Sequence, residues 1–156
     1  MTSTLSDMLD PSCIDLELGG KRKPDIIEAL VKVLGRGGCV SDLKKLTSDV
    51  IEREKVASTG IGSGIAIPHA MSDTVDKTLL AFGLKRDGAR FDSVDNRPVT
   101  LFFLLVGPSG SHVEHLKVLS RIARYLHDDK FCRALHDALT PEEVIAAIEE
   151  KDRNSP

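Results

Sequence analysis

The segment "VTLFFLLV" at 99–106 most constrains the fold, because it is apolar at nearly every position. A strand with one solvated face alternates apolar and polar residues, whereas a strand covered on both faces is apolar throughout. The run is too short to span a bilayer. A second apolar run, "TLLAFGL" at 78–84, predicts a neighbouring strand, since the turn-forming residues "SVDNRP" lie between the two. Both runs therefore indicate a sheet that is covered by helices.

Apolar residues recur at helical spacing in five segments around these runs. The expected helices span 24–34, 41–55, 111–126, 129–138 and 140–150. The chain has 156 residues, of which 41% are hydrophobic, and this is enough for one domain with a sizeable core. We therefore expect a single α/β domain over residues 1–156, in which a small mixed parallel and antiparallel sheet is flanked by helices on both faces.

The expected helix ends carry recognisable signals. Ser41 is the expected N-cap of the second helix. "SHVE" at 111–114 and "TPEE" at 140–143 match the capping box, in which a serine or threonine caps the backbone and a glutamate reaches back. Leu43 and Leu116 are expected on buried faces, because both follow the apolar spacing of their helices. The final "KDRNSP" is expected to be a frayed tail.

Charge and cysteine content exclude several classes of protein. The net charge is −3, and the sequence has no basic stripe of the kind that binds nucleic acid. The N-terminus has no signal pattern, so we expect a cytoplasmic protein that does not insert into the membrane. Cys13, Cys39 and Cys132 are odd in number and lack CxxC spacing, so they predict small buried apolar side chains, not a disulfide framework or a zinc site.

The segment "STGIGSGIAIPHA" at 58–70 changes its backbone character sharply. Its glycines permit positive φ, so the chain can turn back and its N–H groups can converge on an anion. Pro68 has the opposite effect, because it fixes its own φ and extends the preceding residue. The pattern favours His69 held on a rigid base beside a loop of donors. The loop glycines are Gly60, Gly62 and Gly64, and the isoleucines expected in the core are Ile61, Ile65 and Ile67.

Two other readings of this segment remain open from the residues alone. Glycine-rich turns are common, and a histidine after a proline is often an ordinary surface residue. The segment also matches neither the dinucleotide-binding fingerprint nor the P-loop, because no GxGxxG opens a helix and no GK[ST] follows.

Arg53 and His115 strengthen the functional interpretation. Arg53 ends the second expected helix, and its planar fork of donors suits a phosphate, although "EREK" also fits a solvated charged face. His115 lies just past the first turn of a helix, where a positive imidazole is disfavoured, so it should stay neutral with one N–H to donate. It also fits a half-buried helix histidine without a role. His112 is expected to be exposed, and the HxxH pair lacks the further ligands that a metal needs.

Two long segments carry a resemblance to a known family. "EREKVASTGIGSGIAIPHA" at 52–70 resembles the signature of enzyme IIA of the bacterial phosphoenolpyruvate-dependent sugar phosphotransferase system. "FDSVDNRPVTLFFLLVGPSGSHVEHLKVLSRIARYL" at 91–126 resembles the later half of the same family. The match is to the mannitol/fructose type, and especially to its nitrogen-regulatory branch. The resemblance covers roughly residues 5–150.

The resemblance implies roles residue by residue. It makes His69 the acceptor of a phosphoryl group on Nε2, with His115 as the neighbouring second histidine and Arg53 as the arginine beside the site. Ser58 and Thr59 match the pair that lines the pocket. The glycine-loop amides are expected to add further donors around the phosphoryl oxygens.

Many members of the family carry asparagine where this chain has Ser63, and asparagine tolerates the left-handed region better than serine. This departure predicts a loop of slightly different shape and leaves His69 unaffected.

The implied function is that of a phosphocarrier. A histidine-phosphorylated donor of the HPr type would phosphorylate His69, without a nucleotide, metal or cofactor. The group would then pass to a cysteine-bearing IIB protein in sugar uptake, or remain as a signal that regulatory target proteins read. No IIB or membrane domain is attached in this sequence, which favours the regulatory branch. A non-catalytic interaction module is the third alternative, and the intact histidines and arginine argue against it. A homodimer stays open.

Overall fold

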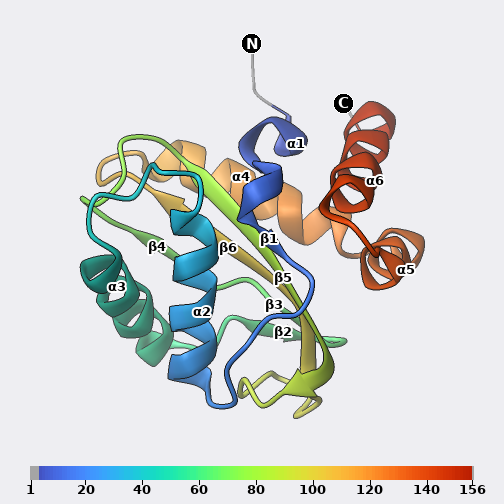
Figure 1. Ribbon diagram of the computed structural model, residues 1–156, viewed down its shortest axis with the longest axis horizontal. Helices are drawn as coiled ribbons and strands as arrows, with labels where there is room; N and C mark the ends of the chain where they lie inside the picture. Colours follow the sequence, from blue (N-terminus) through green and yellow to red (C-terminus); the bar gives the residue numbers. More distant parts are fainter. Residues whose placement is uncertain (1–3, 156) are drawn as a thin grey trace.

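The computed structural model describes residues 4–155, and its centre is a six-stranded mixed sheet (Figure 1). The strand order is β1-β5-β6-β3-β2, and β4 also pairs with β6. β5 is antiparallel to β6, whereas β3 and β4 run parallel to it, so the predicted mixed sheet is confirmed. The strands are β1 (Ile14–Asp15), β2 (Gly60–Gly62), β3 (Ile65–Ala66), β4 (His69–Met71), β5 (Leu79–Ala89) and β6 (Val99–Gly107).

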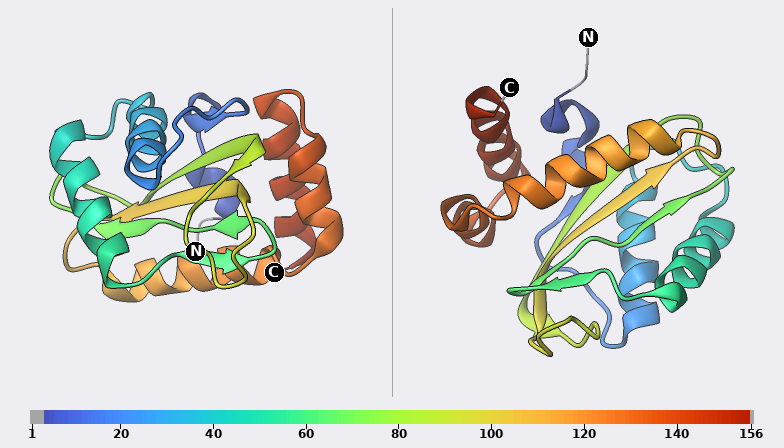
Figure 2. Two further views of the ribbon diagram at one scale, coloured as in Figure 1. Left: turned by 90° about the horizontal axis from the view of Figure 1, so that it is seen from below. Right: turned by 180° about the vertical axis from the view of Figure 1, so that it is seen from behind.

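Helices cover both faces of the sheet, as the apolar runs predicted. In the left panel of Figure 2, α2 lies above the sheet and α4 lies below it, while α3 lies at the left side of the sheet, next to α2 and β4. α5 and α6 pack against each other at one side, and α6 also packs against α1. The helices are α1 (Leu5–Met8), the 3-10 helix η1 (Pro11–Cys13), α2 (Lys23–Gly35), α3 (Leu43–Val56), α4 (His112–Tyr125), α5 (Asp129–Asp137) and α6 (Pro141–Asn154).

The two predicted strands form the core pair of the sheet. Every residue of β6 is buried except Thr100, which is partly exposed. β5 continues beyond the apolar run to Ala89, which pairs with Val99 of β6 after a register shift, although Arg86 and Asp87 in this extension are exposed. Backbone pairing therefore carries the strand past the point where apolar residues end.

Two predicted helix starts need correction. Asp42, not Ser41, caps α3, since its carboxylate accepts a hydrogen bond from the Lys45 N–H at 3.0 Å. The Ser41 N–H and hydroxyl both donate to the Thr74 carbonyl. Ser111 is the N-cap of α4, but its side chain makes no capping hydrogen bond, so the capping box predicted at 111–114 is wrong.

The capping box predicted for α6 forms in part. The Thr140 hydroxyl accepts a hydrogen bond from the Glu143 N–H at 3.2 Å, as expected. The Glu143 carboxylate accepts from the Leu139 N–H at 2.8 Å, one residue before the predicted partner. The glutamate thus satisfies the backbone that leads into the helix and not the N-cap itself.

The expected frayed tail is wrong up to Asn154, because α6 continues to that residue. The Asp152 carboxylate accepts hydrogen bonds from the backbone N–H groups of Leu5 and Ser6 and from the Tyr125 hydroxyl. These contacts tie the start of the chain to its end, and a local pattern around Asp152 does not reveal partners so distant in sequence.

The buried faces of two helices differ from the prediction. Leu43 is 41% exposed and Leu116 is 61% exposed. Leu116 points outward because the buried stripe of α4 is shifted by one residue. That stripe consists of His115, Val118, Ile122 and Tyr125. The shift places a histidine on the face that packs against the sheet.

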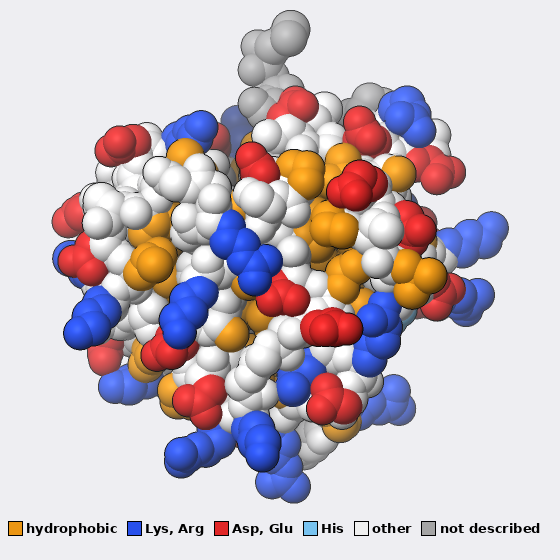
Figure 3. All heavy atoms as spheres, in the orientation of Figure 1, with side chains coloured by type: hydrophobic (Ala, Val, Ile, Leu, Met, Phe, Trp, Pro, Cys, Tyr) orange, Lys and Arg blue, Asp and Glu red, His pale blue; other side chains and the backbone are white. Residues whose placement is uncertain are grey.

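No helix within residues 4–155 is long and apolar enough to cross a membrane. Charged side chains of both signs are interspersed on the face that Figure 3 shows, so this face has no basic stripe among its described residues.

Candidate active site

His69 stands at the beginning of β4, on a base that the neighbouring strand fixes. β4 runs parallel to β6, and His69 is in register with Leu105. The Pro68 carbonyl accepts a hydrogen bond from the Leu105 N–H at 3.0 Å, and Pro68 is buried. The His69 side chain itself is only half-buried. The rigid support that Pro68 predicted is therefore present, and the ring reaches the surface.

One hydrogen bond assigns the two nitrogens of the His69 ring. Nδ1 lies 2.8 Å from the Ile67 carbonyl oxygen. A carbonyl only accepts hydrogen bonds, so Nδ1 carries the proton and Nε2 keeps a free lone pair. Burial lowers the pKa of His69, and the positive charge of Arg53 acts in the same direction; the bond to Ile67 and the charge of Glu54 oppose them. The neutral ring with a nucleophilic Nε2 is thus the prevailing form at pH 7.

His115 lies beside His69, with 5.7 Å between the ring centroids and 49° between the ring planes. Its side chain is 6% exposed. Burial lowers the pKa of His115 to about 4, with smaller contributions from the positive charges of His69, His112 and Arg53. His115 is therefore neutral at pH 7, as its place near the start of a helix predicted.

The tautomer of His115 follows from its surroundings. Nδ1 is buried and has no hydrogen-bond partner among the described residues. It lies against Gly107, where an added Cβ would stand only 3.1 Å from Nδ1. A buried N–H without an acceptor is rarer than an unsatisfied acceptor. The proton therefore belongs on Nε2, which leaves one N–H donor for a ligand.

Arg53 occupies the last turn of α3 and is half-buried. One of its guanidinium nitrogens donates to the Ala57 carbonyl at 3.3 Å. Its positive charge lowers the pKa of both His69 and His115, whose rings lie side by side. A free lone pair, a neutral N–H donor and a guanidinium can together receive a dianionic phosphoryl group.

The hydroxyls of Ser58 and Thr59 are already engaged with the protein. The Ser58 hydroxyl donates to the Phe91 carbonyl at 2.9 Å and accepts from the Gly60 N–H. The Thr59 hydroxyl and N–H both donate to the Glu54 carboxylate, at 2.6 and 2.8 Å. These bonds give no support to the expected role of Ser58, Thr59 and the Gly60 amide in holding a phosphoryl group.

The predicted loop of donors facing His69 is wrong, because the glycine-rich segment forms the β2–β3 hairpin. Its tip adopts left-handed backbone, with φ of 57° at Ser63 and 79° at Gly64. Ile65 is in register with Leu101 of β6, four residues before the partner of His69, which places the tip at least about 13 Å from His69.

The backbone freedom of this segment thus serves a tight turn, and Gly62 and Gly64 do not face the candidate site. Ser63 enters the left-handed region that asparagine favours more than serine does. Ile61 is 48% exposed, so it is not the core anchor that the sequence predicted, whereas Ile65 and Ile67 are buried.

Sequence reasoning missed the Ile67 carbonyl and Glu54. The carbonyl carries no side-chain signal, because every residue has one. In the sequence, Glu54 looks like part of an exposed charged run, because the charged residues at 52 and 55 are close by. Those two residues are exposed, whereas Glu54 is only 6% exposed. Its position on the buried face of α3, four residues after Val50, was the available signal.

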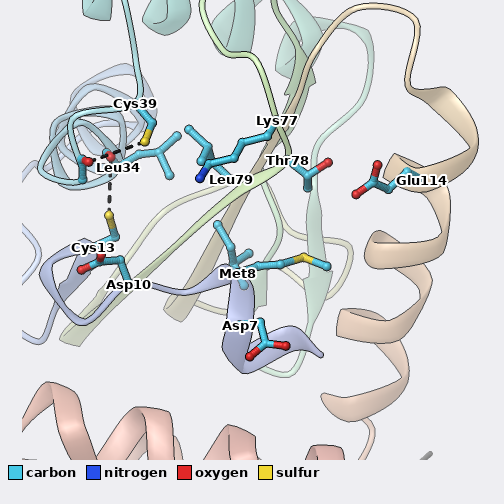
Figure 4. A pocket seen from close by; sticks show the side chains of 12 residues that line it. Asp7, Met8, Asp10, Cys13, Leu34, Cys39, Lys77, Thr78, Leu79 and Glu114 are labelled. Atoms are coloured by element: carbon cyan, nitrogen blue, oxygen red, sulfur yellow. Dashed lines mark hydrogen bonds between the residues drawn. The ribbon is translucent and has the colours of Figure 1, made fainter. Parts of the chain in front are cut away.

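The candidate site is distinct from a cavity of about 380 Å³ between α1, the end of α2 and the start of β5 (Figure 4). Its lining includes Met8, Cys13, Cys39 and Leu79, and neither His69 nor His115 is part of it. Cys13 is buried, whereas Cys39 is exposed, so the expectation of a buried thiol is wrong at that position. His69 is half-buried and reaches the surface, whereas His115 is buried beside it.

Comparison with known families and curated relatives agrees with this geometry. The model of the family described as "Phosphoenolpyruvate-dependent sugar phosphotransferase system, EIIA 2" matches residues 7–151. The nitrogen regulatory protein of Klebsiella oxytoca is 34% identical over 155 residues, which cover 97% of this chain and 93% of that protein. The fructose-specific EIIA component of Haloferax volcanii is 34% identical over 140 residues, which cover 88% of this chain and 91% of that protein.

A larger relative and two solved structures complete the comparison. The fructose-specific EIIABC component of Bacillus subtilis is 32% identical over 149 residues, which cover 96% of this chain but only 24% of that protein. The structure of the nitrogen regulatory protein IIA-Ntr from Neisseria meningitidis has a TM-score of 0.84 at 32% identity, covering 92% of this chain and 98% of that one. The structure of IIA mannitol from Escherichia coli has a TM-score of 0.75 at 23% identity, and the match covers 89% of this chain and 97% of that one. It shares the fold. The chain therefore belongs to the EIIA type 2 family of the phosphoenolpyruvate-dependent sugar phosphotransferase system, whose members carry phosphohistidine and transfer phosphoryl groups.

Proposed function

We propose that the chain is a phosphocarrier of the regulatory, nitrogen-type branch, which accepts a phosphoryl group on Nε2 of His69 from an HPr-like phosphoprotein. The observation that carries this proposal is the hydrogen bond from His69 Nδ1 to the Ile67 carbonyl at 2.8 Å. It holds the proton on one nitrogen and presents the lone pair of the other.

The transfer balances without a metal or an external base. The Nε2 lone pair of His69 attacks the phosphorus of the donor's phosphohistidine, and the N–P bond of the donor breaks with its electron pair returning to the donor ring. Each ring keeps the proton on its second nitrogen. The donor thus leaves as neutral imidazole, and His69 becomes a phosphoimidazolium whose Nδ1–H still donates to Ile67. Nucleophile and leaving group are both imidazole nitrogens, so no strong activation is needed.

Arg53 and His115 act on the charge that the phosphoryl group carries. In the transition state this charge spreads over three equatorial oxygens, and catalysis consists mainly of positioning and electrostatic stabilisation. The neutral His115 donates from Nε2, and Arg53 supplies a planar set of charged donors. Neither group accepts the phosphoryl group itself.

The regulatory branch is supported by the coverage of its relatives. The Klebsiella oxytoca nitrogen regulatory protein and the Neisseria meningitidis IIA-Ntr structure match this chain along most of both lengths. The second candidate is a sugar-uptake subunit, favoured by the fructose-specific component of Haloferax volcanii. A neighbour in fold, mannitol enzyme IIA, was solved in complex with phosphorylated enzyme IIB. A non-catalytic module is disfavoured, because His69, His115 and Arg53 are intact and close together.

Sequential transfer tests the function and its branch. The protein is first incubated with a purified phosphorylated HPr-like donor, and the gain of one phosphoryl group is followed by intact mass. A fructose-type IIB domain is then added. Retention of the phosphoryl group on this protein supports the regulatory role, whereas rapid transfer to the IIB cysteine supports sugar uptake. His69→Gln is the control. A wild-type protein that gains no phosphoryl group would refute both candidates.

A further inference from the structure

Glu54 is a buried carboxylate that the proposed transfer does not use. It lies in the last turn of α3 and is 6% exposed. Its Oε1 accepts a hydrogen bond from the Thr59 hydroxyl at 2.6 Å, and Oε2 accepts from the Thr59 N–H at 2.8 Å. The Lys23 ammonium lies 2.7 Å from Oε2. A buried carboxylate is costly unless it is paired and hydrogen-bonded, so this degree of satisfaction indicates a fixed position.

Two hydrogen bonds to backbone carbonyls connect this carboxylate to the nucleophile. The Thr59 carbonyl accepts a hydrogen bond from the Ile67 N–H at 3.0 Å. The carbonyl of the same Ile67 accepts the hydrogen bond from His69 Nδ1 at 2.8 Å. Glu54 therefore holds Thr59, Thr59 holds Ile67, and Ile67 sets the tautomer of the reacting ring.

The ion pair between Lys23 and Glu54 connects these hydrogen bonds to a second helix. Lys23 opens α2, and its ammonium also lies 4.8 Å from the centroid of the Phe91 ring. Glu54 thus links α2 and α3 to the residues that precede β2. A rigid frame on two helices is the kind of support that keeps a reacting group within a fraction of an ångström of its productive position.

Glu54 acts on His69 through its charge as well as through these hydrogen bonds. Its negative charge raises the pKa of His69, against the lowering by burial and by Arg53. The same charge stabilises the positive ring that forms when Nε2 takes up a phosphoryl group and Nδ1 keeps its proton. Both effects favour the product of transfer.

We propose that Glu54 is a positioning residue for phosphoryl transfer, an inference that rests on the proposed function. Glu54 fixes Thr59 and Ile67 and so keeps the proton of His69 on Nδ1. The substitution that tests it is Glu54→Gln, because the amide has nearly the shape of the carboxylate but not its charge. Glutamine has one acceptor oxygen, so it cannot accept both hydrogen bonds from Thr59 at separate oxygens while also facing Lys23.

The first readout is the tautomer of His69, measured by ¹⁵N NMR of the imidazole without any donor protein. In the wild-type protein we expect the Nδ1–H form to dominate, and in Glu54→Gln a substantial Nε2–H population. The second readout is the transfer rate, for which we expect a fall of roughly tenfold in the maximal rate and an unchanged half-saturating donor concentration. A merely structural role would alter neither the tautomer nor the rate of the folded protein.

Glu52→Gln is the matched control, since Glu52 is exposed, lies on the same helix and pairs with the exposed Lys55. It should leave both readouts at wild-type values. If Glu54→Gln does not fold, Thr59→Val tests the same path, because it removes the 2.6 Å bond and retains the Thr59 N–H; a smaller shift in the same direction is expected.

A folded Glu54→Gln protein, or in its place a folded Thr59→Val protein, with the wild-type tautomer and rate would overturn the proposal. The tautomer readout needs no phosphoryl donor. It therefore tests Glu54 even if the wild-type protein fails to accept a phosphoryl group, in which case the proposed function fails separately.

Discussion

Acidification should destabilise this protein in part through His115. The ring is 6% exposed, and its pKa in the folded protein is about 4, against about 6.5 for an unperturbed histidine. Between these values the unfolded chain binds a proton that the folded protein excludes. The free energy of unfolding should therefore fall as the pH drops from about 6.5 towards 4, and the contribution of His115 is fully present only above this range.

The magnitude follows from the size of the pKa shift. A difference of one bound proton changes the free energy of unfolding by about 1.4 kcal/mol per pH unit. A pKa of about 4 thus corresponds to a loss of at most about 3.5 kcal/mol across the whole window. Burial also lowers the pKa of His69, so His69 contributes in the same direction. Such a loss is a large part of the stability of a typical small domain.

Urea unfolding at pH 7, 6 and 5 measures this effect. Wild-type protein is compared with His115→Gln, because glutamine cannot take up the proton. We expect His115→Gln to lose clearly less stability between pH 7 and 5, whatever its stability at pH 7. His127→Gln, which replaces an exposed histidine outside the site, is the matched control. The same pH dependence in His115→Gln and His127→Gln would refute the reasoning.

Three further predictions concern the transfer step. Arg53→Ala and His115→Ala should each remain folded, as judged by circular dichroism, and should each lower the stopped-flow transfer rate roughly tenfold. Arg53→Lys should recover the rate only in part, because an ammonium lacks the planar fork. Wild-type rates in both alanine variants would contradict the site. Transfer from a purified phosphorylated donor should persist in excess EDTA, and a loss that magnesium restores would contradict the metal-free step. Gly107→Ala should displace His115, since the new Cβ would stand 3.1 Å from Nδ1, and slow transfer several-fold; a wild-type rate would show that the ring tolerates the change.

The covered central strand of the sheet was predictable from the sequence. β6 is apolar at nearly every position, and only a strand covered on both faces satisfies that pattern. The capping of α3 was harder, because Ser41 and Asp42 are both good caps and tertiary contacts decide between them. The Thr74 carbonyl engages Ser41, which leaves Asp42 to cap the helix.

The support beneath His69 was predictable from the sequence, whereas the backbone conformation around it was not. The order of proline and histidine at 68 and 69 indicated a ring on rigid support, and the structure has that support. The glycines suggested an anion-binding loop, and this prediction was wrong. Positive φ serves a hairpin turn equally well, and the sequence does not distinguish the two. The Ile67 carbonyl sets the tautomer of His69 through a backbone atom, and such an atom leaves no trace in residue types.

The central claim is that His69 carries the phosphoryl group on Nε2. The most direct test is NMR of protein labelled with ¹⁵N-histidine after incubation with a phosphorylated HPr-like donor, in which the coupling of phosphorus to nitrogen identifies the ring atom. We predict coupling to Nε2 of one histidine, assigned to His69 by its loss in His69→Gln, with the proton retained on Nδ1. Coupling to Nδ1, or to His115 or any other histidine, would contradict the account.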